Sequence, residues 1–214
     1  MSAFFFDQLP ASVGQFFLAD FVGPEVLADE EKALLVDFKT PKRVYEFSSG
    51  RFCAKKALLQ IGLADQKILR KNGREPLWPD GVVGSISHSA KMAGAIVAYN
   101  AAFEGLGLDI ETVGGVKPEM WRLLFTDAEQ HFLARQTEIS QSQYATLFFS
   151  FKESFYKMQY PLLHAEPDFL DVEITLENGT ATIGTNIFKP NELKLHYAVF
   201  KDQVITSVVK MLVG

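Results

Sequence analysis

The sequence predicts an α+β protein with two similar, pseudo-symmetric lobes, each a small antiparallel sheet packed with a long helix, and an active site between them. Each half contains one long helical pattern, at 41–61 and at 142–160, and hairpin strands follow each pattern. A chain of 214 residues has room for one large domain or two small ones. We therefore expect an N-terminal lobe at 1–104 and a C-terminal lobe at 105–214.

Composition sets limits on the class of protein. A hydrophobic fraction of 48% with 19 phenylalanines provides a sizeable core and excludes wholesale disorder. A net charge of −5 argues against general nucleic-acid binding. The single cysteine, Cys53, excludes an intrachain disulfide and fits a reducing cytosol. The first residues lack the pattern of a signal peptide, and no stretch reaches the length of a membrane span.

The first hundred residues predict two helices after an aromatic-rich start. Residues 1–23 read as strands, and Pro24 begins a helix to about Leu35. Thr40-Pro41 has the N-cap and N1 signature of the helix at 41–61, which Gly62 ends. On that helix Arg51 and Lys55 share a face that reads as basic and solvated.

A loop and a polar hairpin follow. Residues 70–84 contain three glycines and two prolines, so we expect a loop that is either a connector or part of a binding rim. The segment 85–89 pairs with 93–99 as a hairpin. Three serines around His88 offer hydroxyls to a phosphate, although a lone histidine near a strand end is more often structural.

The strand at 105–111 carries two carboxylates on one face. Side chains alternate along a strand, so one face carries Leu106, Leu108 and Ile110 and the other Gly107, Asp109 and Glu111. The two acidic residues lie roughly 6–7 Å apart at the backbone. Like charges that close repel unless a cation or a proton lies between them, and oxygen ligands suit Mg²⁺. The alternative is a strand that runs into a solvated acidic turn.

The C-terminal half predicts further helices and four strands. Thr126 to Glu129 resembles a capping box for a helix to about Arg135. In the helix at 142–160, Glu153 and Lys157 are four residues apart, and the alternative to a functional role is a surface ion pair. Pro161 should end this helix. The remaining strands are 171–176, 180–184, 193–200 and 204–212.

Four blocks in this order resemble the 4′-phosphopantetheinyl transferases of the large, single-chain type, with the enterobactin-type subgroup the closer match. The blocks are Ser49–Leu58, Arg74–Pro79 leading to Gly84–Ser89, Gly107–Glu111 and Phe149–Lys157. The resemblance spans roughly residues 40–175. Phe149 stands where many members of the family have Trp.

The resemblance implies an enzyme that moves the phosphopantetheine arm of coenzyme A to a serine of an apo acyl or peptidyl carrier protein. The reaction requires Mg²⁺ and releases 3′,5′-ADP. By position the metal ligands are Asp109, Glu111 and Glu153. Three carboxylates with open positions for a pyrophosphate suit Mg²⁺.

The resemblance also implies a coenzyme A site in the N-terminal lobe. Ser87 and His88 would hold phosphates, Arg51 is a further phosphate candidate, and Arg74 is a candidate for the nucleotide pocket. Lys157 would reach the pyrophosphate and act with Glu153 in catalysis. Glu153 is the candidate base for the serine proton, directly or through a water on the metal.

Two other functions remain open from the residues. One is a Mg²⁺-dependent phosphohydrolase acting on nucleotides, and the other is a non-catalytic module that binds coenzyme A or a carrier protein. For all three we expect a cytoplasmic protein that engages neither nucleic acid nor membrane. The resemblance further implies a monomer.

Overall fold

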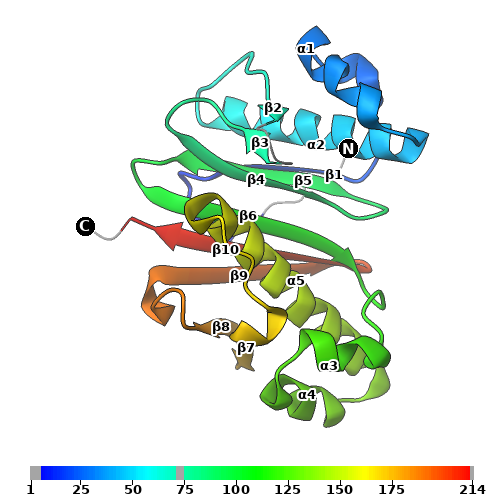
Figure 1. The fold of residues 1–214 in the computed structure, drawn as a ribbon, viewed down its shortest axis with the longest axis vertical. Coiled ribbons are helices and arrows are strands. Elements are labelled where there is room, and N and C mark those ends of the chain that lie inside the picture. The colour runs from blue at the N-terminus through cyan, green and yellow to red at the C-terminus, as the bar shows by residue number, and fades with distance from the viewer. Residues whose placement is uncertain (1–5, 71–74, 213–214) are drawn as a thin grey trace.

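Two three-stranded antiparallel sheets, each packed with a long helix, form the centre of the molecule (Figure 1). The computed structural model describes residues 6–70 and 75–212. The first sheet contains β1 (Gly14–Leu18), β4 (Val82–His88) and β5 (Ala93–Tyr99) in the order β1-β5-β4. The second contains β6 (Phe103–Thr112), β9 (Leu193–Phe200) and β10 (Gln203–Met211) in the order β6-β10-β9. The predicted α+β class is confirmed.

The two halves repeat one arrangement. In the first half, α2 (Pro41–Gln60) follows β1 and precedes the β4–β5 hairpin; in the second, α5 (Glu138–Leu163) follows β6 and precedes the β9–β10 hairpin. In both sheets the last of these strands lies between the other two. This shared order gives the predicted pseudo-symmetry a topological basis.

Helix α2 follows its local sequence signals. Thr40 caps it, accepting a hydrogen bond from the Arg43 amide at 3.3 Å, and Pro41 takes the first helical position. Gly62 follows the helix with a φ of +87°, a conformation that glycine adopts readily. Small buried residues let the helix lie close to the first sheet, among them Cys53, Ala54 and Ala57.

The helix predicted at 24–35 is broken into short pieces. They are the 3-10 turn η1 (Pro24–Val26), helix α1 (Asp29–Lys32) and the 3-10 turn η2 (Ala33–Asp37). The buried carboxylate of Glu31 accepts hydrogen bonds from the amides of Ala28 and Ile68 and pairs with Lys55. These tertiary contacts restart the helix at residue 29 and outweigh its continuous helical propensity.

The segment predicted as the loop 70–84 contains more strand than expected. Strands β2 (Leu69–Arg70) and β3 (Pro76–Leu77) pair with each other, and β4 already begins at Val82. Val82 and Gly84 belong to the β4–β5 ladder, opposite Tyr99 and Val97. Ladder pairing therefore overrides the loop signal of the glycine.

Helix α5 is longer than predicted at both ends. Thr137 caps its start by accepting a hydrogen bond from the Ser140 amide. Pro161 does not end it: the proline lies in the last turn, where its missing amide leaves the Lys157 carbonyl without the usual intrahelical donor, and the helix runs on to Leu163. The end comes at His164, whose φ of +49° is left-handed.

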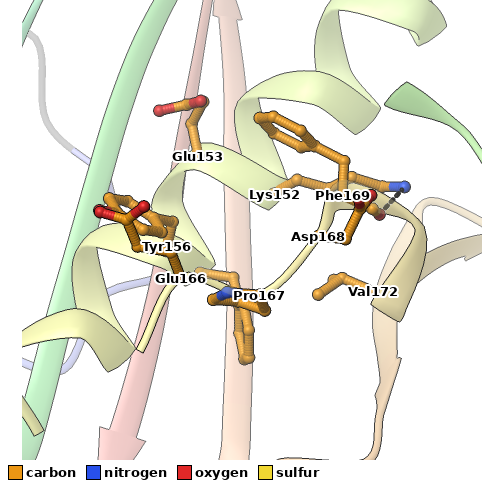
Figure 2. Close-up of a pocket in the computed structure, with 9 residues that line it drawn as sticks. Lys152, Glu153, Tyr156, Glu166, Pro167, Asp168, Phe169 and Val172 are labelled. Atoms are coloured by element: carbon orange, nitrogen blue, oxygen red, sulfur yellow. Dashed lines mark hydrogen bonds between the residues drawn. The ribbon is translucent and has the colours of Figure 1, made fainter. Parts of the chain in front are cut away.

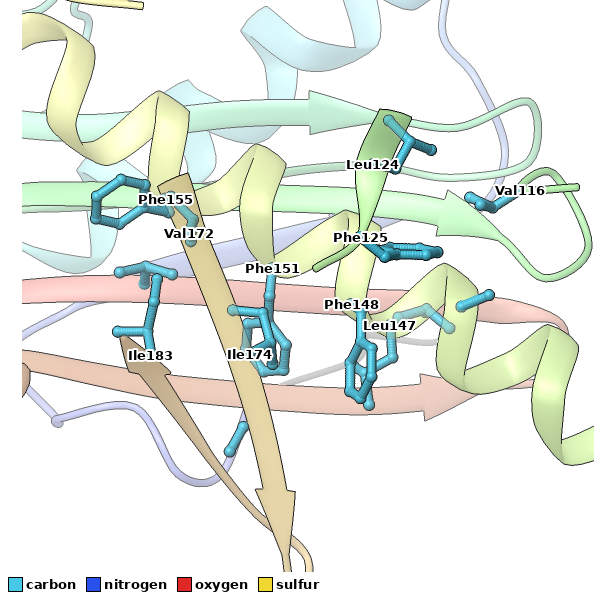
Figure 3. Close-up of a cluster of buried hydrophobic side chains, with 14 of the residues drawn as sticks. Val116, Leu124, Phe125, Leu147, Phe148, Phe151, Phe155, Val172, Ile174 and Ile183 are labelled. Carbon is cyan, nitrogen blue, oxygen red and sulfur yellow. The ribbon is translucent and has the colours of Figure 1, made fainter. Parts of the chain in front are cut away.

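Smaller elements cover the second half. They are η3 (Pro118–Met120), α3 (Trp121–Leu124), α4 (Asp127–Ala134), η4 (Phe169–Asp171), η5 (Pro190–Glu192), and the hairpin of β7 (Val172–Glu177) and β8 (Thr180–Thr185). The predicted capping box of α4 is confirmed. Phenylalanines of α5 pack with β7 and β8 in one buried cluster (Figure 3).

A further apolar cluster is shared by the two halves. It contains Phe17 and Ile96 from the first sheet and Phe103, Leu108 and Ile205 from the second. All five side chains are at most 3% exposed. Burial of such side chains contributes about 1.5–3 kcal/mol each, so the two sheets stabilise one another.

Serine hydroxyls join the neighbouring strands β4 and β6. The hydroxyl of Ser85 accepts from the Leu108 amide at 3.0 Å, and that of Ser87 accepts from the Ile110 amide at 3.2 Å. The Ser89 hydroxyl, just after β4, donates to the side-chain oxygen of Gln203. We call these three residues the serine seam. Within the described ranges, no helix is long and apolar enough to cross a membrane.

Candidate functional site

Asp109 lies at the centre of a buried polar network between β4, β6 and α5. Its carboxylate accepts from the hydroxyl of Ser87 at 3.1 Å, from that of Ser150 at 2.9 Å and from the Lys157 ammonium at 2.6 Å. The side chain is only 4% exposed. Charge-assisted bonds of this kind hold a carboxylate in one orientation.

The glycines of β6 explain how α5 comes so close. A Cβ on Gly107 would lie 1.8 Å from the carbonyl oxygen of Ser154, and one on Gly105 would lie 2.9 Å from that of Met158. The predicted alternation of β6 therefore turns Gly107 and Asp109 toward the helix backbone. The two glycines therefore allow the backbone of α5 to pack directly against this face of β6.

Lys157 links the two halves at this point. Its ammonium donates to the Ser87 hydroxyl at 3.1 Å as well as to Asp109, and its side chain is 29% exposed. The structure thus brings three of the predicted site residues, Ser87, Asp109 and Lys157, into direct contact. The roles assigned to them remain predictions.

Glu111 and Glu153 belong to the same electrostatic environment. Burial raises the pKa of Glu111 to about 7, with further contributions from the charges of Asp109 and Glu153, which Lys157 opposes. Burial also raises the pKa of Glu153, and Lys157 again opposes the shift. Each raised pKa means that the loss of water around the carboxylate is not offset by the positive charge of Lys157.

A metal ion at this position would have only oxygen ligands. Among the described residues, no three acidic, histidine or cysteine side chains are gathered closely enough to hold a metal ion. The Lys157 ammonium takes the place of a cation beside Asp109. The all-oxygen donor set and the excess negative charge nevertheless fit Mg²⁺ chemically.

His88 lies against the first turn of α2. Its Nε2 is 3.1 Å from a guanidinium nitrogen of Arg43, and the same nitrogen donates to Glu46 at 3.1 Å. Burial lowers the pKa of His88, Glu46 opposes this effect, and Arg43 and Lys157 reinforce it. Arg43 is not among the site residues predicted from the sequence. Its position in the first turn of α2 gives little indication of a binding role, because its partner His88 lies 45 residues away in the sequence.

Arg51 has a different environment from the carboxylates. It is 6% exposed, and its guanidinium donates to the carbonyls of Ile68 at 2.7 Å and Leu69 at 3.3 Å while lying 4.4 Å from the Phe47 ring centre. Burial lowers its pKa to about 10. The structure does not bring Arg51 together with Asp109. Arg74 lies outside the described residues.

The basic face expected at Arg51 and Lys55 is wrong. Arg51 is buried, and the Lys55 ammonium pairs with the fully buried carboxylate of Glu31 at 2.5 Å. Both cations stabilise the segments that cover α2, namely η1 to α1 and Ile68, the residue before β2.

A cavity of about 820 Å³ lies between the halves. Its lining comes from β3, β4, the start of β6 and the C-terminal turns of α5, and includes Pro76, Trp78, Ser85, Leu106 and Lys157. A second cavity of about 270 Å³ lies between α5 and the segment 166–169, with Glu153 and Phe169 in its wall (Figure 2). Tyr156 and Glu166 line both cavities, and the Tyr156 hydroxyl donates to Glu166 at 3.4 Å.

Lys152 is a motif residue to which the sequence analysis gave no role. Its ammonium is buried and donates to the Glu129 carboxylate at 2.7 Å and to the carbonyls of Leu124 and Phe169, both at 2.8 Å. It therefore ties α3, α4 and η4 to α5. The buried lysine of the motif stabilises the fold beside the site.

The fold and the site together define a two-halved α+β protein with a cleft between the halves and a carboxylate–lysine cluster at its wall. Two family models match the chain. The 4'-phosphopantetheinyl transferase N-terminal domain matches residues 30–98, and the 4'-phosphopantetheinyl transferase superfamily matches residues 105–209.

Relatives with known names agree with these models. The 4'-phosphopantetheinyl transferase Svp of Streptomyces mobaraensis is 34% identical over 171 residues, covering 78% of this chain and 68% of the relative. Enterobactin synthase component D of Escherichia coli strain K12 is 33% identical over 168 residues, covering 77% and 76%. This chain therefore belongs to the 4′-phosphopantetheinyl transferase family, and it is a phosphopantetheinyl transferase.

Among solved structures, a holo-(acyl-carrier-protein) synthase from Bacillus anthracis in complex with CoA (3',5'-ADP) is similar to half of the molecule. The TM-score is 0.45 at 19% identity, and the match covers 52% of this chain and 99% of that chain.

Proposed function

We propose that this enzyme transfers the phosphopantetheine arm of coenzyme A to a serine of an apo acyl or peptidyl carrier protein in a Mg²⁺-dependent reaction that releases 3′,5′-ADP. The observation that carries the proposal is the 2.6 Å contact of Lys157, which lines the cavity between the halves, with Asp109, whose charge also acts on Glu111 and Glu153. The division into lobes at 1–104 and 105–214 is part of this proposal, and the repeated sheet order supports it.

Coenzyme A would lie along the cleft. Its nucleotide fits the larger cavity beside Pro76 and Trp78, where an aromatic ring offers a stacking surface. The Lys157 ammonium and the Ser87 hydroxyl face the phosphates, and His88 with Arg43 offers a second group of nitrogen donors. The neutral arm would reach the smaller cavity beside Glu153.

Arg51 and Arg74 remain candidates for nucleotide contacts. Arg51 holds the carbonyls of Ile68 and Leu69. Its contribution to binding would therefore come through the position of these two residues as much as through its charge.

Asp109, Glu111 and Glu153 would hold the Mg²⁺ ion. When bound, the ion neutralises the pyrophosphate and stabilises the leaving phosphate. Ser87 and Ser150 hold the Asp109 carboxylate in place from both sides. The raised pKa values of Glu111 and Glu153 support a cation among these carboxylates, because added positive charge would lower both.

The transfer step needs a general base and a group that stabilises the negative charge on the leaving group. The serine oxygen of the carrier forms a bond to the phosphorus that bears the pantetheine arm, and the bond from that phosphorus to the bridging oxygen breaks. Glu153, in the wall of the smaller cavity, would take the serine proton as general base. Lys157 holds the negative charge that builds on the leaving 3′,5′-ADP.

The remaining properties rest on sequence and family. A cytoplasmic enzyme that acts without nucleic acid agrees with the single cysteine and the acidic net charge, and the monomeric state and independence from membranes follow the family resemblance.

Intact mass spectrometry tests the reaction. Apo carrier proteins of fatty-acid, polyketide and peptide-synthetase type are incubated separately with the enzyme, coenzyme A and Mg²⁺, with an EDTA control. We expect a mass gain of one phosphopantetheine arm that EDTA abolishes, and no gain with Asp109→Ala.

Other outcomes would contradict the proposal. Phosphate release from nucleotides without a carrier would favour a phosphohydrolase. Tight coenzyme A binding with no transfer to any carrier would favour a binding module. Transfer that survives both EDTA and Asp109→Ala would refute the assigned metal site.

A further inference from the structure

Gln203 connects the turns at one end of the site. It begins β10, is 3% exposed, and lies opposite Thr112 in the β6–β10 ladder. Its side-chain oxygen accepts from the Ser89 hydroxyl, and its side-chain nitrogen donates to the Thr112 hydroxyl at 3.2 Å and to Asp202 at 3.0 Å. All of its side-chain polar atoms therefore have partners.

The partners of Gln203 are direct neighbours of site residues from different halves. Ser89 follows His88, which belongs to the first half and faces Arg43. Thr112 follows Glu111, which belongs to the second half. One buried side-chain amide thus ties the hydroxyl of the residue next to His88 to the hydroxyl of the residue next to Glu111.

No β4–β6 backbone ladder replaces this connection. Among the described residues the two sheets are separate, and serine hydroxyls bridge β4 to β6 at Ser85 and Ser87. Gln203 completes the serine seam at the end where His88 and Glu111 lie. Side-chain hydrogen bonds break more easily than a ladder of backbone hydrogen bonds. The spacing between β4 and β6 at this end therefore depends on the few side chains that bridge them.

We propose that Gln203 is a positioning residue for transfer: through Ser89 and Thr112 it holds the phosphate-binding residues of the first half at a fixed spacing from the carboxylates of the second. This inference rests on the proposed function of those residues. A displacement of about 1 Å between reacting groups lowers a rate by about 100-fold, so loss of this connection should be visible in function.

The chain offers a matched control. Lys91 and Asp202 form an exposed ion pair between the same two turns, with side chains 60% and 42% exposed. Lys91→Ala removes this surface link and leaves the Gln203 contacts intact. Exposed pairs contribute about 1 kcal/mol or less, so this variant should behave as wild type.

The test measures coenzyme A affinity by calorimetry with and without Mg²⁺, together with thermal stability. In the wild type and in Lys91→Ala, Mg²⁺ should tighten binding. In Gln203→Ala we expect at least a fivefold smaller tightening, with the metal-free affinity changed less than twofold. Ser89→Ala and Thr112→Val, which each remove one partner residue and leave the glutamine in place, should show intermediate losses.

The outcomes separate the inference from the proposed function. If wild type responds to Mg²⁺ and Gln203→Ala responds equally, the positioning role is refuted while the proposed function stands. If coenzyme A affinity of the wild type ignores Mg²⁺, the proposed metal role and this inference both fail. If Gln203→Ala does not fold, Ser89→Ala and Thr112→Val provide the test. The inference is refuted if Mg²⁺ tightens coenzyme A binding in both variants as much as in the wild type.

Discussion

Cys53 lies where α2 packs on the first sheet, with no exposed surface. Burial raises the pKa of its thiol to about 12, so at pH 8 the thiolate is essentially absent from the folded protein. We predict no reaction with an aromatic disulfide reagent at pH 8 and full reaction in denaturant. Spectrophotometric thiol counting checks this, and rapid labelling of the folded enzyme would contradict the packing of α2.

Lys152 and Glu129 form a buried ion pair whose two members depend on each other. Burial lowers the pKa of Lys152 and raises that of Glu129, and their mutual attraction opposes both shifts. Removing one partner leaves an uncompensated buried charge, so Lys152→Met should lower the free energy of unfolding by about 3–5 kcal/mol. Urea unfolding measures the change.

Two further variants sharpen that prediction. Adding Glu129→Gln to Lys152→Met removes the uncompensated charge and should recover part of the loss. Lys39→Met, at an exposed position, should stay within about 0.5 kcal/mol of wild type. Equal losses in the single and the double variant would show that the charge is not the cause.

At the scale of elements, the contact of β6 with α5 depends on Gly107. A Cβ there would lie 1.8 Å from the Ser154 carbonyl oxygen, which is backbone and cannot turn away. We predict that Gly107→Ala lowers the free energy of unfolding by more than about 3 kcal/mol through this clash. Thermal and urea unfolding test it.

Gly184 provides the control for that substitution. It also lies in a strand, β8, and the nearest atom to a Cβ there is 3.9 Å away. Gly184→Ala should therefore change stability by less than about 1 kcal/mol. Similar losses at both glycines would point to backbone effects rather than to the approach of α5.

The elements also show how far local sequence determines this fold. Helix α2, the capping box of α4 and the alternation of β6 could be predicted, because caps and periodicity act over a few residues. The helix expected at 24–35 was wrong because the buried Glu31 carboxylate binds a segment 37 residues away. The contacts among Ser87, Asp109 and Lys157 span 22 to 70 residues and have no local signal.

At the scale of the whole molecule, the two halves share an apolar cluster between their sheets. Neither half can bury its share alone, so we predict one cooperative unfolding transition for the entire chain. The two tryptophans make this testable, because Trp78 lies in the first half and Trp121 in the second. In Trp78→Phe and Trp121→Phe variants, the remaining tryptophan should report the same urea midpoint as circular dichroism on the same variant.

A split result would contradict this account. If the Trp121 signal and the Trp78 signal changed at well-separated urea concentrations, the halves would be independent domains. A fragment of residues 1–104 that showed a cooperative transition by itself would lead to the same conclusion.

The pairing of β6 with β10 has a consequence for synthesis on the ribosome. All strands of the first sheet have been translated once Tyr99 is made, but the β6 partner Gln203 comes 91 residues after Thr112. The strand β6, which carries Asp109, therefore lacks its partner β10 until α5 and the rest of the second half have been translated. A nascent chain paused before β10 would carry an uncovered apolar face suited to chaperone binding, and the proposed metal site would be among the last parts of the enzyme to form.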